Sequence, residues 1–389
     1  MPGRAERLAI LRFENMSGDL SAAWQGRALS DVLTKQLDGI PAAKLHSFDR
    51  LLGPRPISAP GISTEAAEAL AAGATRVGYG EFTVRNGKLE TRLTLEDLRT
   101  YKMVKVVEAV VPAGDVLGAA APLARQISAT VKPYDTHNPE ALHHYTEALE
   151  SQASERTERE LDQAIAADPD FPAPYTPLAQ SRLQRQDRTG AIAILEQGIA
   201  RTGIAEAQRA RFESEIAQVR GDTRARATAL AKLSKLEPKD LDVWRALAQT
   251  SMAYHDYPQA RNAYDKASAL APEDADLLNQ LGYAATQSGD LDAGVAALKR
   301  YRTMRPKDAN ALDSLGDVHL IAGKLSQAES YYLEAYKLDP AFLTGGDLLK
   351  AAMARLLAGD VAAADKNANA YFTARQQARD PLVEYRRAH

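Results

Sequence analysis

The side chains of this sequence that could do metal chemistry are its histidines, three of which lie close together. His137, His143 and His144 belong to a total of seven. Two adjacent histidines on a helix point about 100° apart, and no carboxylate stands at a ligand spacing such as H-E-x-x-H. We therefore interpret the pair as surface histidines and predict no metal site.

Nucleophilic and cofactor chemistry find no support in the sequence. It contains no cysteine, which excludes disulfides, thiolate nucleophiles and cysteine-held clusters. It contains no G-x-S-x-G or Walker motif, and the short G-x-G of Gly78 and Gly80 precedes a hairpin where a nucleotide fingerprint requires a helix. We predict that the protein is not an enzyme and binds no cofactor.

One loop could bind an anion. Residues 13–19 would lie at the carboxyl end of the first strand, where backbone amides of the following helix could face a ligand. The Asn, Ser and Asp side chains of this loop can instead cap backbone groups within a polar connection. We favour the capping interpretation and keep a small-ligand sensor of a bacterial signalling system as the alternative function.

The charge balance gives no sign of a polyanion partner. The chain carries 48 Lys and Arg against 51 Asp and Glu, for a net charge of −3. The basic cluster between Arg220 and Arg226 has no interleaved aromatic residues and is typical of a solvated turn. No stretch approaches the roughly 18 apolar residues of a membrane helix. We expect no nucleic acid partner and no direct membrane insertion, and a cytoplasmic chain, or an extracytoplasmic one if an upstream anchor or signal has been removed.

The elements that would position these residues begin with an α/β layer over residues 1–133. Asn86-Gly87 separates two alternating segments within residues 80–94 and permits a tight hairpin, because both residues can adopt positive φ. Periodicity predicts the other elements, which are strands at 7–13, 44–48 and 103–111, a loop at 53–61, and helices at 26–37, from Ser63 or Thr64 to 72, and at 116–131. We expect a mixed sheet with helices against one face.

Beyond residue 137 the sequence is periodic. Pro238, Pro272, Pro306 and Pro340 each follow the preceding proline by 34 residues. A period of this length indicates stacked pairs of helices. Small residues recur where the two helices of a pair would cross, because close approach requires them.

Glycines support the same register. Gly289, Gly323 and Gly359 fall where the first helix of a pair should end, and glycine supplies the left-handed cap. We predict fourteen helices in seven repeats, of which the third rests on length more than identity and the seventh needs two residues inserted ahead of Gly359. The predicted bounds are 138–171, 172–206, 207–240, 241–274, 275–308, 309–342 and 343–378, with a tail at 379–389.

The repeats resemble the tetratricopeptide family. In the fourth unit the signature positions hold Trp244, Leu247, Ala248, Ala260, Tyr264, Ala267 and Pro272. The resemblance implies a solenoid wound as a right-handed superhelix, whose concave groove binds peptides or partner proteins. The set of Lys, Asn and Arg with which chaperone-type repeats hold a terminal carboxylate is missing here.

The family resemblance also indicates which residues line the groove. In the family, the second, fifth, sixth, ninth and twelfth positions of each first helix face the concave side. Here they include Arg211, Glu215, Arg245, Gln249, Asn279, Gln280, Tyr283, Asp313 and Asp317. These residues could form a polar contact strip with Tyr283 as its aromatic anchor, or they could be ordinary outward-facing polar side chains.

The amino-terminal layer resembles the TolB-like domain that precedes tetratricopeptide arrays in bacterial signalling and envelope proteins. The match is carried by residues 10–19, 26–29 and 78–82. It implies a scaffold or adaptor in which the groove engages a protein or peptide and the α/β domain docks a second component. The identity of the partner and the oligomeric state stay open.

Overall fold

The structure, a computed structural model, describes residues 7–37, 67, 69, 74–151, 154–383 and 387. The chain divides into two compact units, Met1–Asp222 and Thr223–His389. The first unit contains β1 (Leu8–Ile10), β2 (Glu14–Asn15), the 3-10 helix η1 (Leu20–Ala22), α1 (Trp24–Gln36), β3 (Arg76–Arg85), β4 (Lys88–Asp97), β5 (Lys102–Pro112), α3 (Val116–Ile127), α4 (Pro139–Glu150), α5 (Ser154–Ala167), α6 (Tyr175–Gln184), α7 (Arg188–Ile199) and α8 (Glu206–Arg220). The second contains α9 (Thr223–Leu236), α10 (Leu241–Ala253), α11 (Tyr257–Leu270), α12 (Ala275–Gln287), α13 (Leu291–Met304), α14 (Asn310–Ile321), α15 (Leu325–Leu338), the 3-10 helix η3 (Phe342–Gly345), α16 (Asp347–Leu357) and α17 (Val361–Gln377).

The sheet of the first unit is mixed, as predicted. β1 and β2 pair with β3 in parallel, and β3, β4 and β5 follow as antiparallel neighbours. The turn between β3 and β4 is formed by Asn86 and Gly87, whose φ angles are 53° and 70°. Both central residues of the hairpin therefore adopt the left-handed conformation that the Asn-Gly pair favours.

Several predicted bounds differ from those in the structure. The strand expected at 7–13 ends at Ile10, because the chain then turns so that the backbone N–H of Phe13 donates to the carbonyl oxygen of Gly26 at 3.1 Å. The helix expected at 116–131 ends at Ile127, and Ser128 is extended. The strand at 44–48 and the loop at 53–61 lie outside the described residues, as does the helix up to 72 apart from residues 67 and 69, which are helical.

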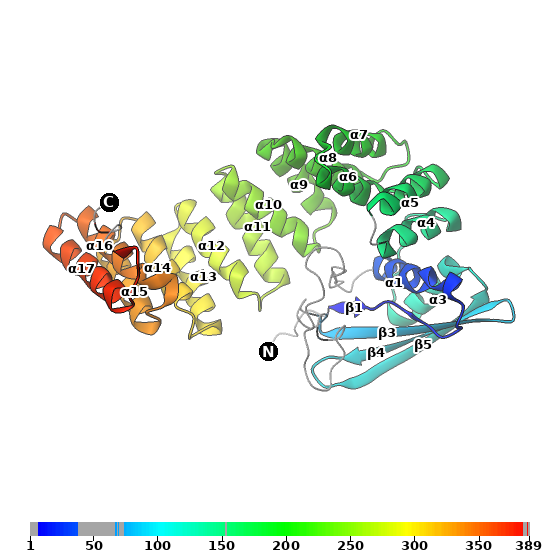
Figure 1. The fold of residues 1–389 in the computed structure, drawn as a ribbon, viewed down its shortest axis with the longest axis horizontal. Helices are drawn as coiled ribbons and strands as arrows, with labels where there is room; N and C mark the ends of the chain where they lie inside the picture. Colours follow the sequence, from blue (N-terminus) through cyan, green and yellow to red (C-terminus); the bar gives the residue numbers. More distant parts are fainter. Residues whose placement is uncertain are drawn as a thin grey trace. The chain divides into compact units, whose positions relative to one another are not determined.

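The two faces of the sheet differ in polarity. α1 and α3 cover one face (Figure 1), and against them Leu89 and Leu93 of β4 are fully buried. The opposite face carries a second buried cluster at β1 and the start of β3, where Ala9 and Val77 are fully buried. Farther along it Arg92 lies 3.7 Å from Glu81 and 3.6 Å from Glu108, and these side chains are 48–66% exposed. This part of the sheet alternates as an antiparallel sheet with one solvated face does.

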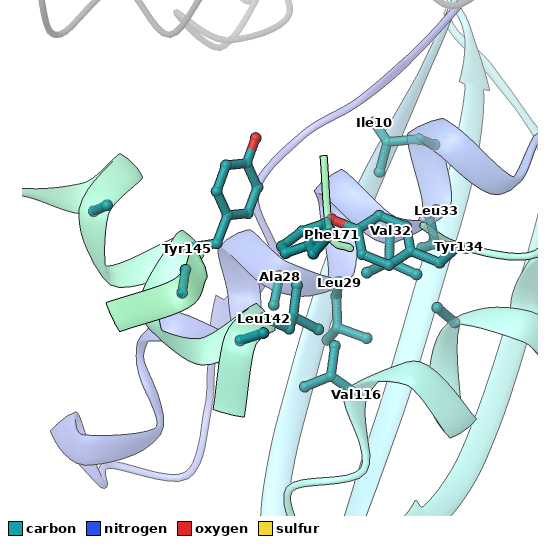
Figure 2. Close-up of a cluster of buried hydrophobic side chains, with 14 of the residues drawn as sticks. Ile10, Ala28, Leu29, Val32, Leu33, Val116, Tyr134, Leu142, Tyr145 and Phe171 are labelled. Carbon is teal, nitrogen blue, oxygen red and sulfur yellow. The ribbon is translucent and has the colours of Figure 1, made fainter. Parts of the chain in front are cut away.

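The apolar core of the first unit continues from the sheet into the helical pairs. Leu29 of α1 belongs to the same buried cluster as Leu142 and Tyr145 of α4 and as Phe171 (Figure 2). The hydroxyl of Tyr134 adds a polar contact, because it donates to Asp31 at 2.6 Å. The predicted division between residues 133 and 138 stays a prediction, and the residues on its two sides share one core.

The described residues include fourteen helices, α4–α17, beyond the sheet, as predicted. Consecutive helices pack as pairs within each unit, namely α4 with α5, α6 with α7, α10 with α11, α12 with α13, α14 with α15 and α16 with α17, and the division into seven repeats stays a prediction. Small residues stand where the helices cross. A Cβ at Gly282 would lie 2.5 Å from Leu298, and one at Gly316 would lie 2.5 Å from the ring of Tyr332. Only glycine allows these two pairs to approach so closely.

The ends of the first helices in the second unit are also confirmed. Gly289, Gly323 and Gly359 have φ angles of 94°, 69° and 77° and follow α12, α14 and α16. The insertion expected in the last repeat lies between α15 and α16. There Leu343, Thr344 and Gly345 are all left-handed.

Candidate functional site

The predicted groove residues lie on the first helices of their pairs. Arg211 and Glu215 belong to α8 in the first unit, and all the others belong to the second unit. In the second unit we call the fifth and ninth positions of the first three complete repeats the first-helix row. Its members are Arg245 and Gln249 on α10, Asn279 and Tyr283 on α12, and Asp313 and Asp317 on α14.

Asp317 is the centre of a hydrogen-bond network along this row. The hydroxyl of Tyr283 donates to Asp317 Oδ2 at 2.7 Å, and the hydroxyl of Tyr332 donates to Asp317 Oδ1 at 2.8 Å. Burial, followed by the charge of Asp317, raises the pKa of both phenols above the usual range. Tyr283 is therefore a protonated donor that joins α12 to α14.

Lys350 of α16 binds both carboxylates of α14. Its Nζ donates to Asp313 Oδ1 at 2.6 Å, to Asp313 Oδ2 at 2.8 Å and to Asp317 Oδ1 at 3.0 Å. Burial alone would lower the pKa of Lys350, but these hydrogen bonds and charges raise it. Asp313 is 5% exposed, so this predicted groove residue is covered and cannot meet a partner unless Lys350 moves.

Asp347 completes the network from the first turn of α16. Its side chain is fully buried, and neither carboxyl oxygen has a donor partner. Burial raises the pKa of Asp347 to about 8, and a hydrogen bond shared with Asp313 and the charge of Asp313 act in the same direction. At neutral pH Asp347 is thus mostly protonated.

The remaining members of the row differ in whether their side chains are bonded within the chain or exposed to solvent. Arg245 Nη2 forms an ion pair with Asp274, which also caps the start of α12. Asn279 is half-buried, and Oδ1 of its amide has no donor partner. Gln249 and the predicted groove residue Gln280 are exposed. The exposed side chains named here are therefore neutral amides rather than free charges.

Glu215 is the half-buried acid at the ninth position of the predicted third repeat, in the first unit. The hydroxyl of Thr176 on α6 is bonded to both of its carboxylate oxygens, at 3.0 and 2.9 Å. Burial raises the pKa of Glu215 to about 7, although the Thr176 hydrogen bond and the charge of Arg211 favour the ionised form. Unlike Asp313, Glu215 has no lysine bonded to it among the described residues.

The loop of residues 13–19 uses its polar side chains locally. Asn15 Oδ1 accepts from the backbone N–H of Ser17 at 3.0 Å, and Asp19 Oδ1 accepts from that of Ser21 at 2.9 Å. Asn15 Nδ2 donates to the carbonyl oxygen of Asp19 at 2.7 Å. These contacts are those of a capped connection, and they favour that interpretation over an anion site.

The histidine pair has structural partners. His143 stacks on Trp24 with ring centroids 4.4 Å apart, and His144 Nδ1 lies 2.8 Å from Glu160. Within the part of the chain that the structure describes, no group of three or more His, Asp or Glu could hold a metal ion. No described helix combines the length and hydrophobicity that crossing a membrane requires.

Sequence reasoning missed the residues that complete the network, namely Tyr332, Asp347 and Lys350. The repeat register contains a signal for part of it, since Tyr283 and Asp317 are the ninth positions of consecutive repeats and lie 34 residues apart. Lys350 is 37 residues from Asp313 because the insertion ahead of α16 shifts the register. Only the three-dimensional path of that insertion brings its ammonium group to α14.

Comparisons with known proteins support the repeats. The tetratricopeptide repeat family matches residues 245–309 and 287–341, within the three repeats of clearest register. The first crystal structure matched is that of MamA, at 20% identity and a TM-score of 0.38 over 46% of this chain and 96% of that one. YrrB, described as a tetratricopeptide protein with an unusual peptide-binding site, has 16% identity and a TM-score of 0.41 over 48% and 95%. PilW, a type IV pilus biogenesis factor, has 20% identity and a TM-score of 0.38 over 52% and 91%. No curated protein matches the chain by sequence.

Proposed function

We propose that this chain, a small α/β layer followed by an array of tetratricopeptide repeats, is a non-enzymatic scaffold that binds a protein or peptide on the first helices of the second unit. In the same proposal the α/β layer, which resembles TolB-like domains, docks a second component of a bacterial assembly or signalling system. Both partners are proteins, and the chain holds them through surfaces rather than through an enclosed pocket.

The observation that carries the proposal is that the charged side chains of the first helices form ion pairs within the chain, whereas two of their amide side chains are exposed. Asp313 and Asp317 are tied to Lys350, and Arg245 is tied to Asp274, so these charges hold the helices in register. Gln249 and Gln280 lie on the same set of helices and are exposed. An exposed amide can both donate and accept hydrogen bonds with a partner, and because its backbone is already helical, binding orders only the side chain.

Site-specific photocrosslinking in cells of the source organism tests this function. A photoreactive phenylalanine analogue replaces Gln280 in the full-length chain, and the matched control carries it at Arg300, an exposed residue of the second helix α13. We expect a discrete crosslinked protein at position 280 and at least a tenfold weaker product at position 300. Equal crosslinking at both positions, or crosslinks at neither, would contradict the proposal.

A further inference from the structure

Strand β5 forms one edge of the sheet in the first unit. Among the described residues it pairs with β4 alone, from Lys102 to Pro112. An edge strand carries backbone N–H and C=O groups that point away from the sheet, and an extended segment of another protein can pair with them. The register of the sheet determines which residues of β5 carry these groups.

The hairpin between β3 and β4 sets that register. Arg85 and Lys88 close its two-residue turn, so they exchange hydrogen bonds, and every second pair of residues along β3 and β4 does the same. The residues of β4 that lie between those pairs therefore bond to β5. It follows that Val106, Glu108 and Val110, which alternate with the residues bonded to β4, direct both their N–H and their C=O groups outward.

A side chain of α3 agrees with this direction. Gln126 Nε2 donates to the carbonyl oxygen of Glu108 at 3.0 Å. Because this oxygen points away from β4, the Gln126 amide takes the place that the N–H of an added strand would occupy. No described residue supplies such a partner to the N–H of Glu108 or to the backbone groups of Val106 and Val110.

The three outward residues also share one face of the sheet. Their side chains lie on the solvated face, where Glu108 and Val110 are 66% and 59% exposed and Val106 is half-buried. The features that usually protect an edge strand lie outside this stretch, since the β-bulge precedes Val106 and Pro112 ends the strand. We call residues 106–110 the open edge.

Charges alternate across the solvated face toward the open edge. Glu81 of β3 lies opposite Arg92 of β4, and Arg92 lies opposite Glu108 of β5. Arg92 is 3.7 Å from Glu81 and 3.6 Å from Glu108, so one arginine serves two carboxylates. The row ends at the edge with a carboxylate, and a basic side chain in the next place would add a favourable cross-strand pair.

The same row disfavours a second copy of this chain as the occupant. Antiparallel pairing of two open edges, with all three outward residues paired, would place Glu108 opposite the same residue of the copy. Like charges directly opposite one another are destabilising. Charge complementarity therefore favours a different protein that brings a basic residue to this place.

We propose that the open edge of β5 binds an extended segment of a partner protein as a further antiparallel strand, with a lysine or arginine opposite Glu108. This inference rests on the part of the proposed function in which the α/β layer docks a second component, and it specifies the chemistry of that component. The residues two places before and after the basic one face Val106 and Val110, so β-branched apolar side chains fit there. The N–H of the basic residue replaces the Gln126 amide at the carbonyl oxygen of Glu108.

Binding of a designed peptide to the full-length chain tests the inference. The probe is Thr-Val-Thr-Lys-Thr-Val-Thr with blocked ends. One control peptide is methylated on the backbone nitrogen of its lysine, which removes the donor to Glu108 and keeps every side chain, and the other has glutamate in place of lysine. Amide hydrogen exchange is followed by NMR in the chain labelled at valine nitrogen. The signals of Val106 and Val110 are identified by their loss in Val106→Ile and Val110→Ile.

We expect the lysine peptide to slow amide exchange at Val106 and Val110 and to leave Val107 unchanged, because the N–H of Val107 already bonds to β4. Each control peptide should bind about tenfold more weakly. Unchanged exchange at Val106 and Val110 with the peptide bound, or equal binding of the lysine peptide and its methylated form, would overturn the inference.

A pair of matched variants tests the charge. Glu108→Gln should weaken binding of the lysine peptide about fivefold. Glu90→Gln makes the same change on the same face, one strand away from the edge, and should alter binding by less than about twofold. Equal losses in the two variants would contradict the place assigned to the basic residue.

Slow exchange of Val106 and Val110 in the chain alone would mean that the open edge is already paired, and it would overturn the inference. Light scattering would then show a dimer if the occupant is a second copy. Protection of these amides by the peptide together with a negative crosslinking result at Gln280 would leave the inference standing and contradict partner binding on the first helices. The reverse pattern would do the opposite.

Discussion

The two compact units are stabilised differently where their helices meet. In the first unit, α1 joins the sheet to the first helical pair through fully buried apolar side chains such as Leu29 and Leu142. In the second, the first helices α12, α14 and α16 are joined by the carboxylates of Asp313 and Asp317 with Lys350 between them. The stability that an apolar contact gives does not change with pH. The stability of the network in the second unit depends on the charge of Lys350 and on the protonation of Asp347.

Breaking the apolar contact should have the largest effect. Leu29→Ala should lower the free energy of unfolding of the first unit by about 2–5 kcal/mol, because it leaves a cavity among residues that cannot close it. Leu20→Ala is the control, since Leu20 is 87% exposed, and should change it by less than about 0.5 kcal/mol. Denaturant unfolding followed by the fluorescence of Trp24 in a Trp244→Phe background measures the first unit. An equal effect of both changes would show that α1 does not join the sheet to the repeats.

Removing the cation of the network should come next. Lys350→Met leaves Asp313, Asp317 and Asp347 facing one another and should cost the second unit about 2–3 kcal/mol, less than for a fully buried pair because a third of the lysine side chain is exposed. Trp244 fluorescence in a Trp24→Phe background reports this unit. The control Lys266→Met changes an exposed lysine and should have little effect. Adding Asp313→Asn to Lys350→Met should restore part of the loss, and no restoration would argue against the network.

The pH dependence of stability should distinguish the buried Asp347 from the half-buried Glu215. The pKa of Asp347 is about 8 in the folded state and near the usual value of about 3.9 when unfolded, so the folded chain holds a proton that the unfolded chain releases. Its contribution to stability is therefore complete below about pH 4 and falls as the pH rises toward 8. Asp347→Asn removes this loss, so its stability relative to the parent should rise between about pH 4 and pH 8 in denaturant unfolding followed at several pH values.

The corresponding variant of Glu215 should gain stability relative to the parent over a narrower pH range. With a pKa of about 7, Glu215 releases its proton on unfolding between about pH 4.3 and 7. Glu215→Gln should thus gain relative stability up to about pH 7 and no further, and the change should appear in the first unit only. A gain that continues to pH 8 in both variants would show that the two acids do not differ as described.

The smallest effect should follow from changing the partner of Glu215. Thr176→Val removes the hydroxyl that bonds both carboxylate oxygens, and this should raise the pKa of Glu215 above 7. The cost should be about 1 kcal/mol at pH 8, where the carboxylate is charged, and smaller at pH 5. Thermal unfolding at the two pH values measures it. A cost that does not depend on pH would mean that Thr176 contributes packing alone.

The candidate site was only partly predictable from the sequence. The register placed Tyr283, Asp313 and Asp317 on the first helices, since a 34-residue period fixes which side of each helix faces its neighbour. It did not show that Asp313 would be covered. Lys350 comes to Asp313 through a turn of three left-handed residues ahead of α16, and such a turn leaves no periodic signal in the sequence.

Local rules in the sequence by themselves determined the helical pairs, their glycine caps and the Asn-Gly hairpin, because each depends on the conformations that a few adjacent residues can adopt. The tertiary structure decided which charged side chains are paired within the fold and which side chains stay exposed. Asp347 shows the reason. An aspartate is normally a charged surface residue. Full burial, together with the charge of Asp313, raises the pKa of Asp347 so that its carboxyl group is mostly protonated at neutral pH. That burial depends on residues that are distant in the chain.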